Sequence, residues 1–166
     1  LFFSFNLSAQ AYPNKPVTVI VPFSAGSASD VVTRVLLEKV SSNTNTRFIF
    51  DNRPAAGGNV GTAAVVKAEP DGYTIGLSTS GPLAVNKILN PDLGYDPERD
   101  LQPIALFAIL PNIIVVSSTL NINNLSQLND YIRKTPDVGY GSVGNGSSQH
   151  LAGAYYEQLL GAKMTH

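Results

Sequence analysis

Residues 17–30 read Val17-Thr-Val-Ile-Val21, followed directly by Pro22-Phe-Ser-Ala-Gly-Ser-Ala-Ser-Asp30. The first five residues are β-branched and predict a buried strand, whereas the next nine are mostly small or polar and lead into a run with helical spacing from Val31 to Leu36. We call this combination of strand, loop and helix start the first junction. It directs several backbone N–H groups and the positive end of the helix dipole to one place, so it can hold an anion.

The composition of the first junction favours a carboxylate or a neutral polar group as its ligand. It has no Lys or Arg between Pro22 and Asp30, and it lacks the Gly-Lys-Ser/Thr ending of a P-loop. Asp30 would repel a multiply charged phosphate. Asp30 also has other interpretations, because an acidic residue in a first helical turn complements the dipole, fixes the loop or contacts an amino group of a ligand.

A second junction of the same kind spans Tyr140-Gly-Ser-Val-Gly-Asn-Gly-Ser-Ser-Gln-His150 and precedes a helical run from Leu151 to Leu160. It also has no basic residue. Two uncharged, hydroxyl-rich helix N-termini in different halves of a chain predict two jaws that close on one small ligand. This is the outline of a solute receptor.

Composition excludes several other classes of protein. The 166 residues are 43% hydrophobic with a net charge of −1, which indicates an ordinary folded core and no basic surface for nucleic acid. The absence of cysteine excludes disulfides and Cys-based zinc sites, and two histidines do not suggest a metal site, so we expect no metal and no cofactor. We expect no membrane span beyond the N-terminal segment.

The N-terminal segment, Leu1 to Ala11, is apolar and ends in Ala9-Gln10-Ala11, which is typical of a signal-peptide cleavage site. We interpret residues 1–11 as the remnant of a secretory signal peptide, so that the mature chain begins near Tyr12 and is exported. The alternative is a short apolar strand or a disordered end.

Strand and helix patterns alternate throughout the chain, which predicts an α/β fold with a largely parallel sheet. Strands are expected at 47–50 and 73–77, with helices at 60–67 and 82–89. The second of these strands ends in Ser78-Thr79-Ser80. Because ligands bind beyond the carboxyl ends of parallel strands, this tip is expected beside the first loop.

The second part of the chain is shorter. We place a crossing between domains at Pro111-Asn112, which divides the chain into a first α/β domain at 12–111 and a partial second domain at 112–166. Asn124 and Gln127 predict a capped helix over 125–134, and a strand is expected at 138–142. Because only about a third of the chain follows the crossing, we expect a C-terminally truncated protein whose second domain is incomplete and whose first domain lacks a returning segment.

Three motifs in the second part have other interpretations. The G-x-G-x-x-G match at 139–144 lacks a preceding strand and a correctly spaced acidic residue, so it does not predict a dinucleotide site. Ser147 and His150 could serve a hydrolase, but they are three residues apart with no acid to orient the imidazole, and His150 fits a capping or pocket-wall residue better. Tyr155, Tyr156 and Leu159 are predicted to be core residues by their helical spacing.

An ordered series of motifs after residue 11 resembles the Bug family, the periplasmic solute receptors of tripartite tricarboxylate transporters. The motifs are Tyr12-Pro-Asn-Lys-Pro, Val21-Pro-Phe-Ser-Ala-Gly, Asp51-Asn-Arg-Pro-Ala-Ala-Gly-Gly-Asn59, Pro70-Asp-Gly-Tyr73, Tyr95-Asp-Pro97 and Gly144-Asn-Gly-Ser-Ser-Gln-His-Leu151. The resemblance implies a two-domain fold of the type II periplasmic-binding-protein kind. It also implies a non-catalytic receptor that holds a carboxylated metabolite, such as a dicarboxylate, tricarboxylate, acidic amino acid or aromatic acid, and passes it to a membrane permease.

The resemblance also implies which residues contact the ligand. They are Phe23, Ser24, Ala25, Gly26, Ser27, Asp30, Ser78, Thr79, Gly144, Asn145, Gly146, Ser147 and Ser148. The chain departs from the family pattern at Ser27 and Ala55, where glycine is common, and in the absence of the rest of the second domain. A ligand sensor that reports to a signalling partner is a further alternative, because it would use the same pocket.

Overall fold

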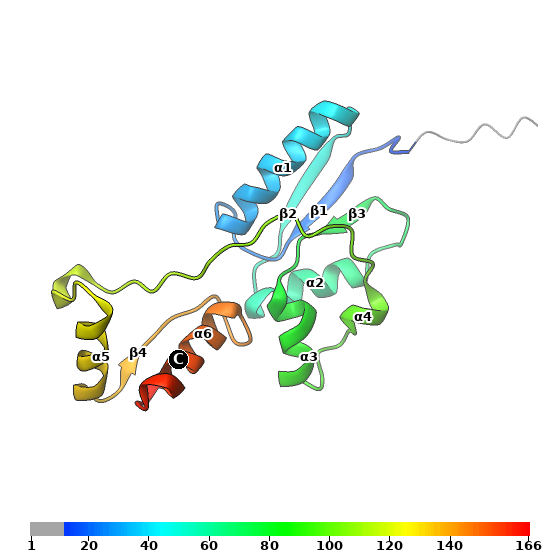
Figure 1. The fold of residues 1–166 in the computed structure, drawn as a ribbon. Helices are drawn as coiled ribbons and strands as arrows, with labels where there is room; N and C mark the ends of the chain where they lie inside the picture. Colours follow the sequence, from blue (N-terminus) through cyan, green and yellow to red (C-terminus); the bar gives the residue numbers. More distant parts are fainter. Residues whose placement is uncertain (1–11) are drawn as a thin grey trace, which may run out of the picture.

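The computed structural model describes residues 12–166, so the proposed signal-peptide remnant at 1–11 lies outside the described residues. Its first sheet is parallel and has the order β2–β1–β3, in which β1 is Val17–Val21, β2 is Phe48–Asn52 and β3 is Thr74–Gly76 (Figure 1). Val19 and Val21 of β1 are buried, as expected for a central strand of β-branched residues. The predicted parallel α/β architecture is therefore confirmed.

Two helices cover opposite faces of this sheet. Helix α1 (Ala28–Thr44) lies on the face of Phe50, where the Arg34 guanidinium is 4.3 Å from the ring centroid. Helix α2 (Asn59–Val66) lies on the other face, and it packs so closely that a Cβ added to Gly61 would lie 2.6 Å from Pro22 Cα. The loops that follow β1 and β3 begin at the same edge of the sheet, because Ile20, near the end of β1, pairs with Gly76, the last residue of β3.

The chain after β3 folds into short helices that pack on this lobe. A 3₁₀ turn, η1 (Ala56–Gly58), precedes α2, and a π-helical turn, η2 (Gly81–Val85), continues into α3 (Asn86–Leu89). Helix α4 (Pro97–Asp100) follows. The helix expected at 82–89 is thus present, but its first turn is π-helical. We call residues 12–100 the first lobe.

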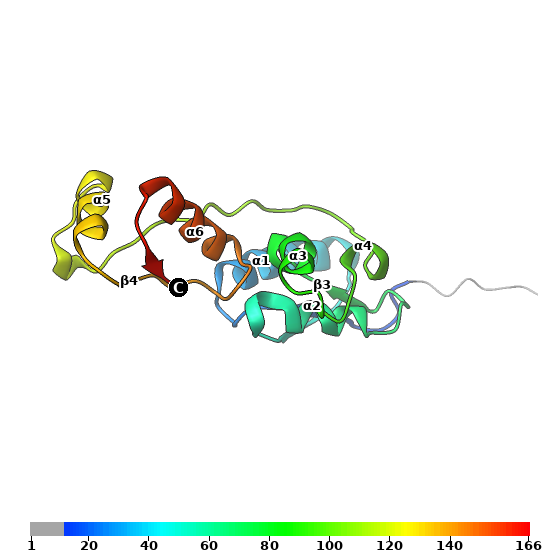
Figure 2. The same ribbon diagram turned by 90° about the horizontal axis from the view of Figure 1, so that it is seen from below.

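An extended segment without helix or strand, residues 101–117, leads away from the first lobe (Figures 1 and 2). We call it the crossing segment. It reaches a second lobe, residues 118–166, with η3 (Ser118–Leu120), α5 (Leu125–Lys134), β4 (Val138–Gly139), α6 (Ser148–Leu160) and β5 (Met164–Thr165). Strands β4 and β5 are parallel, and Leu128, Ile132 and Leu160 form the lobe's small core.

Two expectations for the second lobe are wrong. Strand β4 ends at Gly139 instead of residue 142, because pairing with β5 involves only two residues of each strand. Tyr155 and Leu159 are exposed, because α6 packs on its neighbours through one side only, whereas Tyr156 does pack against the core. Over residues 12–166, every helix is too short or too polar to cross a membrane.

Candidate functional site

The first loop, residues 22–27, connects β1 to α1 and is closed by local hydrogen bonds. The Ser27 hydroxyl caps α1 by accepting from Asp30 N at 3.3 Å, and Gly26 N donates to Asp30 Oδ2 at 2.9 Å. Gly26 has a φ of 80°, a backbone conformation that glycine adopts without strain. Ser27, one of the two departures from the family pattern, thus has a structural use as the helix cap.

Asp30 fixes this loop through a buried polar network. Its carboxylate is 2% exposed and accepts from Arg34 Nε at 2.9 Å and from Asn52 Nδ2 at 2.9 Å. The hydrogen bond from Arg34 is the main cause that lowers the pKa of Asp30 to about 2. Because these partners and Gly26 N occupy the carboxylate, its contacts support the loop-fixing interpretation rather than an ionic contact with a ligand.

Asn52 and Arg34 belong to the same network, and the sequence analysis missed both. Asn52 Nδ2 also donates to Phe23 O at 3.0 Å, and Arg34 Nη2 donates to Asn52 Oδ1 at 3.0 Å. Asn52 therefore ties the beginning of the first loop to the Asp30 that holds its end. The position of Asn52 as the last residue of β2, next to the end of β1, is the signal that could have identified it.

The tip of the third strand lies at the same sheet edge as the first loop. The Ser78 hydroxyl shares a hydrogen bond of 2.9 Å with the Thr62 hydroxyl on α2, and Thr62 is buried. Thr79 O accepts from Leu83 N at 3.1 Å, which fixes the start of the π-helical turn. Ser78 and Thr79 thus reach the edge that the sequence predicts for them.

The second loop, residues 140–147, is also held by its own polar groups. Gly144 N donates to Ser142 Oγ at 3.0 Å, and the Ser147 hydroxyl caps α6 by accepting from His150 N at 3.2 Å. Ser147 is 4% exposed, whereas Ser148 is exposed at the first position of α6. The Ser147 hydroxyl therefore has a capping role, whereas the exposed Ser148 hydroxyl makes only long contacts of 3.4 Å, to Asn112 Oδ1 and to Gln149 Oε1.

His150 faces the second loop and not the Ser147 hydroxyl. Its Nδ1 accepts from Gly146 N at 3.0 Å, and its ring stacks on that of His166 with centroids 4.1 Å apart. Within residues 12–166, the hydrogen bond between Ser147 and His150 uses the His150 backbone. This arrangement does not provide the base that a serine nucleophile requires.

The second loop reaches the first lobe at η1 and η2. A Cβ added to Gly144 would lie 2.8 Å from Gly57 N, and one added to Gly81 would lie 2.9 Å from Gly146 O. The structure therefore brings Gly144 and Gly146 to the first lobe beside η1 and η2. Gly57, Gly81 and Asn86 are the neighbours that the sequence analysis did not identify, although the Gly57-Gly58 pair was visible in a motif.

The two loops share an electrostatic character. Neither the first loop nor the second loop contains Lys or Arg. Each loop leads into the N-terminus of a helix with more than twelve residues, α1 and α6 respectively. Asp30, the acidic group that closes the first loop, is paired with Arg34. Among residues 12–166, no cluster of three or more side chains is suited to a metal ion. Such surroundings suit a ligand with carboxylate oxygens, which amides and hydroxyls can bind by donating hydrogen bonds.

Comparisons with known proteins agree in family and fold. Residues 32–166 match the profile of the tripartite tricarboxylate transporter family receptor. The BugT protein of Bordetella pertussis is 34% identical over 158 residues, and a protein from the tcbD–tcbE intergenic region of Pseudomonas sp. strain P51 is 34% identical over 157 residues. The alignments cover 94% of this chain and 46–48% of those relatives, so the chain spans about half of their length.

Solved structures give the same result. A periplasmic transporter has a TM-score of 0.90 at 34% identity, over 94% of this chain and 53% of that one. A Rhodopseudomonas palustris protein solved with adipate has a TM-score of 0.89 at 31% identity, over 93% and 52%. MatC from the same organism, solved with malate, has a TM-score of 0.82 at 27% identity, over 93% and 53%. The described residues thus share the fold of half of a periplasmic binding protein.

Proposed function

The chain belongs to the tripartite tricarboxylate transporter receptor family, and we propose that it supplies the ligand-binding loops of a periplasmic receptor for a small carboxylated metabolite. The observation that carries the proposal is the pair of helix N-termini, α1 and α6, each preceded by a loop without basic residues. Solved relatives that contain adipate and malate support the same ligand class.

We assign the ligand contacts to three groups of residues. The first loop contributes backbone amides and the Ser24 hydroxyl, the strand tip contributes Ser78 and Thr79, and the second loop with the start of α6 contributes amides and the Ser148 hydroxyl. Hydrogen bonds to a charged group contribute about 1.5–3 kcal/mol each. Two or three of them account for a large share of the roughly 8 kcal/mol of a micromolar complex, without any cation.

We further propose residues 12–111 and 112–166 as parts of two domains, the crossing segment as their connection, and a separate membrane permease as the partner that receives the ligand. The family and the solved relatives are substrate-binding proteins, so we propose a receptor without catalysis. The orientation of His150 toward Gly146 N supports this choice over a Ser147 hydrolase.

The test is a calorimetric titration of residues 12–166 with adipate and with malate. The ligand affinities of two variants, Ser148→Ala and Ser126→Ala, are compared with that of the unchanged chain. Both serines are exposed in the first turn of a helix in the second lobe, α6 and α5 respectively. Because Ser148→Ala removes one charge-assisted hydrogen bond, it should weaken affinity about tenfold, whereas Ser126→Ala should leave it unchanged. Equal affinities of the two variants would contradict the assignment of Ser148.

A further inference from the structure

The two lobes touch at glycine residues that leave no room for a side chain. On the first lobe, a Cβ added to Gly57 would lie 2.9 Å from Asn145 O, and one added to Gly81 would lie 2.9 Å from Gly146 O. On the second lobe, a Cβ added to Gly144 would lie 2.8 Å from Gly57 N, and one added to Gly146 would lie 1.6 Å from Asn86 Oδ1. All four separations are below 3.0 Å, so none of these positions can carry a side chain while the lobes stay in contact.

This property is not shared by every glycine of the chain. A Cβ added to Gly94 or Gly141 would meet no atom within 4 Å. We call the four contacting residues, Gly57, Gly81, Gly144 and Gly146, the glycine seam. The seam joins segments from different lobes that the crossing segment separates in sequence.

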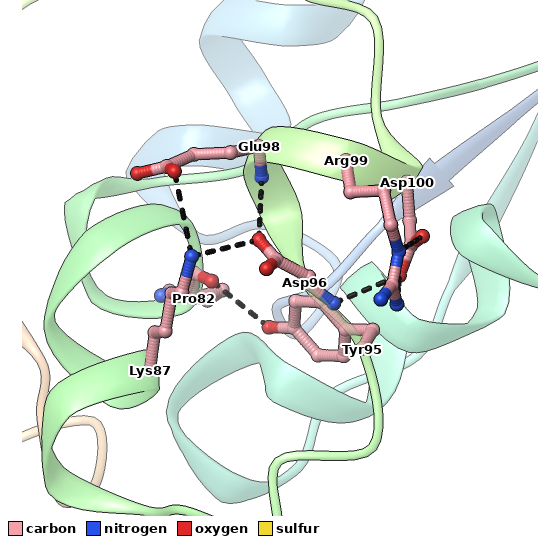
Figure 3. A network of polar contacts seen from close by, with 7 residues as sticks. All are labelled: Pro82, Lys87, Tyr95, Asp96, Glu98, Arg99 and Asp100. Atoms are coloured by element: carbon pink, nitrogen blue, oxygen red, sulfur yellow. Dashed lines mark hydrogen bonds and ion pairs between the residues drawn. The ribbon is translucent and has the colours of Figure 1, made fainter.

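The first-lobe side of the seam is held rigidly. Asn86 is 3% exposed, and its Nδ2 donates to Asn59 Oδ1 at 2.7 Å. Tyr95 Oη donates to Pro82 O at 3.0 Å, directly after Gly81, and the surrounding ion pair of Lys87 with Asp96 is 2.9 Å long (Figure 3). Because these groups fix η2 and α3, the first lobe has little freedom to accommodate a new side chain.

The second-lobe side is held by side chains of its own lobe. His150 Nδ1 accepts from Gly146 N, and Ser142 Oγ accepts from Gly144 N. Gly146 directly precedes Ser147, the cap of α6. A displacement at the seam is therefore transmitted to the N-terminus of α6.

We infer that the glycine seam sets how closely the two lobes approach, and that Gly57 and Gly81 are positioning residues that bring the α6 N-terminus to the ligand. The part of this inference that concerns the ligand rests on the proposed function. A side chain added at the seam separates the lobes. Fewer molecules then have the lobes in contact, which is the arrangement that binds the ligand.

The experiment measures the distance between the two lobes in the absence of ligand. Spin labels are attached at Lys39→Cys and Asp130→Cys, and the distance between them is measured by pulsed electron–electron double resonance. Both positions are exposed, on α1 and α5, and the sequence contains no other cysteine. Gly81→Ala is compared with Gly139→Ala, since neither residue has a positive φ and a Cβ added to Gly139, in β4, would meet only Thr165 O at an ordinary contact distance of 3.8 Å. We expect Gly81→Ala to shift the distribution to longer distances and Gly139→Ala to leave it unchanged. Identical distributions would overturn the inference.

A second pair keeps the test decisive if Gly81→Ala does not fold. Gly57 and Gly94 both have positive φ, 63° and 81°, so alanine introduces backbone strain at both but a contact with the other lobe only at Gly57. Gly57→Ala should lengthen the distance relative to Gly94→Ala, and equal distances would overturn the inference.

The role in binding is tested separately, by titrating the Gly81→Ala and Gly139→Ala chains with adipate and with malate. Affinity at least about tenfold weaker in Gly81→Ala supports the positioning role. Longer distances with unchanged affinity would overturn that role. If the wild-type chain bound neither dicarboxylate, the proposed function would fail, while the distance measurement would still decide whether the seam sets the approach of the lobes.

Discussion

At the scale of single residues, the first loop depends on one carboxylate. Asp30 receives hydrogen bonds from Gly26 N, Arg34 and Asn52, and Asn52 in turn holds Phe23 O. Both ends of the loop are thus fixed before any ligand arrives. A loop held in this way loses little conformational entropy on binding, which favours affinity.

The Asp30 network predicts a specific dependence of stability on pH. The folded pKa of about 2 lies below the ordinary value of 3.8, so the ionised carboxylate stabilises the fold above about pH 4. This stabilisation is lost as the pH falls from about 4 to about 2. Urea unfolding at several pH values should show a steeper loss of stability on acidification for the wild type than for Asp30→Asn.

The comparison with Asp30→Asn is necessary because Arg99 also lowers the pKa of Asp100 to about 2. Asp100 makes the same contribution to the pH dependence of the wild type and of Asp30→Asn. Its contribution therefore cancels when the two unfolding free energies are subtracted. Parallel pH profiles for the two proteins would mean that Asp30 is not stabilised as an ion in the folded state.

At the scale of elements, the N-terminus of α6 has one observed role and one proposed role. Ser147 caps the helix, and the same helix end is proposed to face the ligand. Ser147→Ala should lower the free energy of unfolding by about 1 kcal/mol, because the cap is lost. Ser147→Asp keeps a capping oxygen and should restore stability, measured by urea unfolding.

The two substitutions of Ser147 separate stability from binding. Although Ser147→Asp restores the cap, its negative charge should repel a carboxylate and weaken affinity below that of Ser147→Ala. Ligand affinity that is unaffected by Ser147→Asp would show that the α6 N-terminus does not face the anion.

Local sequence signals explain which elements could be predicted. The β-branched run of β1 ends at Pro22, and α5 begins after the Asn124 cap, so both have the predicted bounds. The Gln127 side chain supports the same helix start, because its Oε1 accepts from Asn123 N at 2.8 Å, one residue before the cap. Patterns of this kind depend on residues a few positions apart, which a sequence displays directly.

Contacts between distant segments explain what could not be predicted. The apolar spacing of α6 identifies a helix, but it does not tell whether Tyr155 and Leu159 are covered. Similarly, Gly81 meets Gly146 only after two lobes have folded, and the occupation of the Asp30 carboxylate by Asn52 depends on the pairing of β1 with β2. The candidate site residues could be proposed from motifs, whereas their structural roles required the fold.

At the scale of the whole molecule, the crossing segment is the stretch of residues 12–166 in which exposed apolar side chains are most concentrated. Ile109 and Val115 are 85% and 83% exposed, and residues 101–117 form no strand pairing in the described part of the chain. Extended apolar backbone without a partner is prone to association. Sedimentation velocity of residues 12–166 should therefore show association that increases with concentration.

Charged residues in the crossing segment should reduce this association. Ile109→Lys with Val115→Lys should shift the sedimentation coefficient toward the monomer, whereas Gln102→Lys, at an exposed polar position of the same segment, should have a smaller effect. A wild-type chain that remains monomeric at all concentrations would contradict the prediction.

The central claim is that one carboxylated ligand contacts both the first loop and the second loop. Its most direct test is a titration of ¹⁵N-labelled residues 12–166 with a dicarboxylate, followed through backbone amide chemical shifts in nuclear magnetic resonance spectra. The account predicts that amides of Ser24 to Gly26 and of Gly144 to Ser148 shift together, with one common dissociation constant. Shifts confined to a single loop, or absent from both, would contradict it.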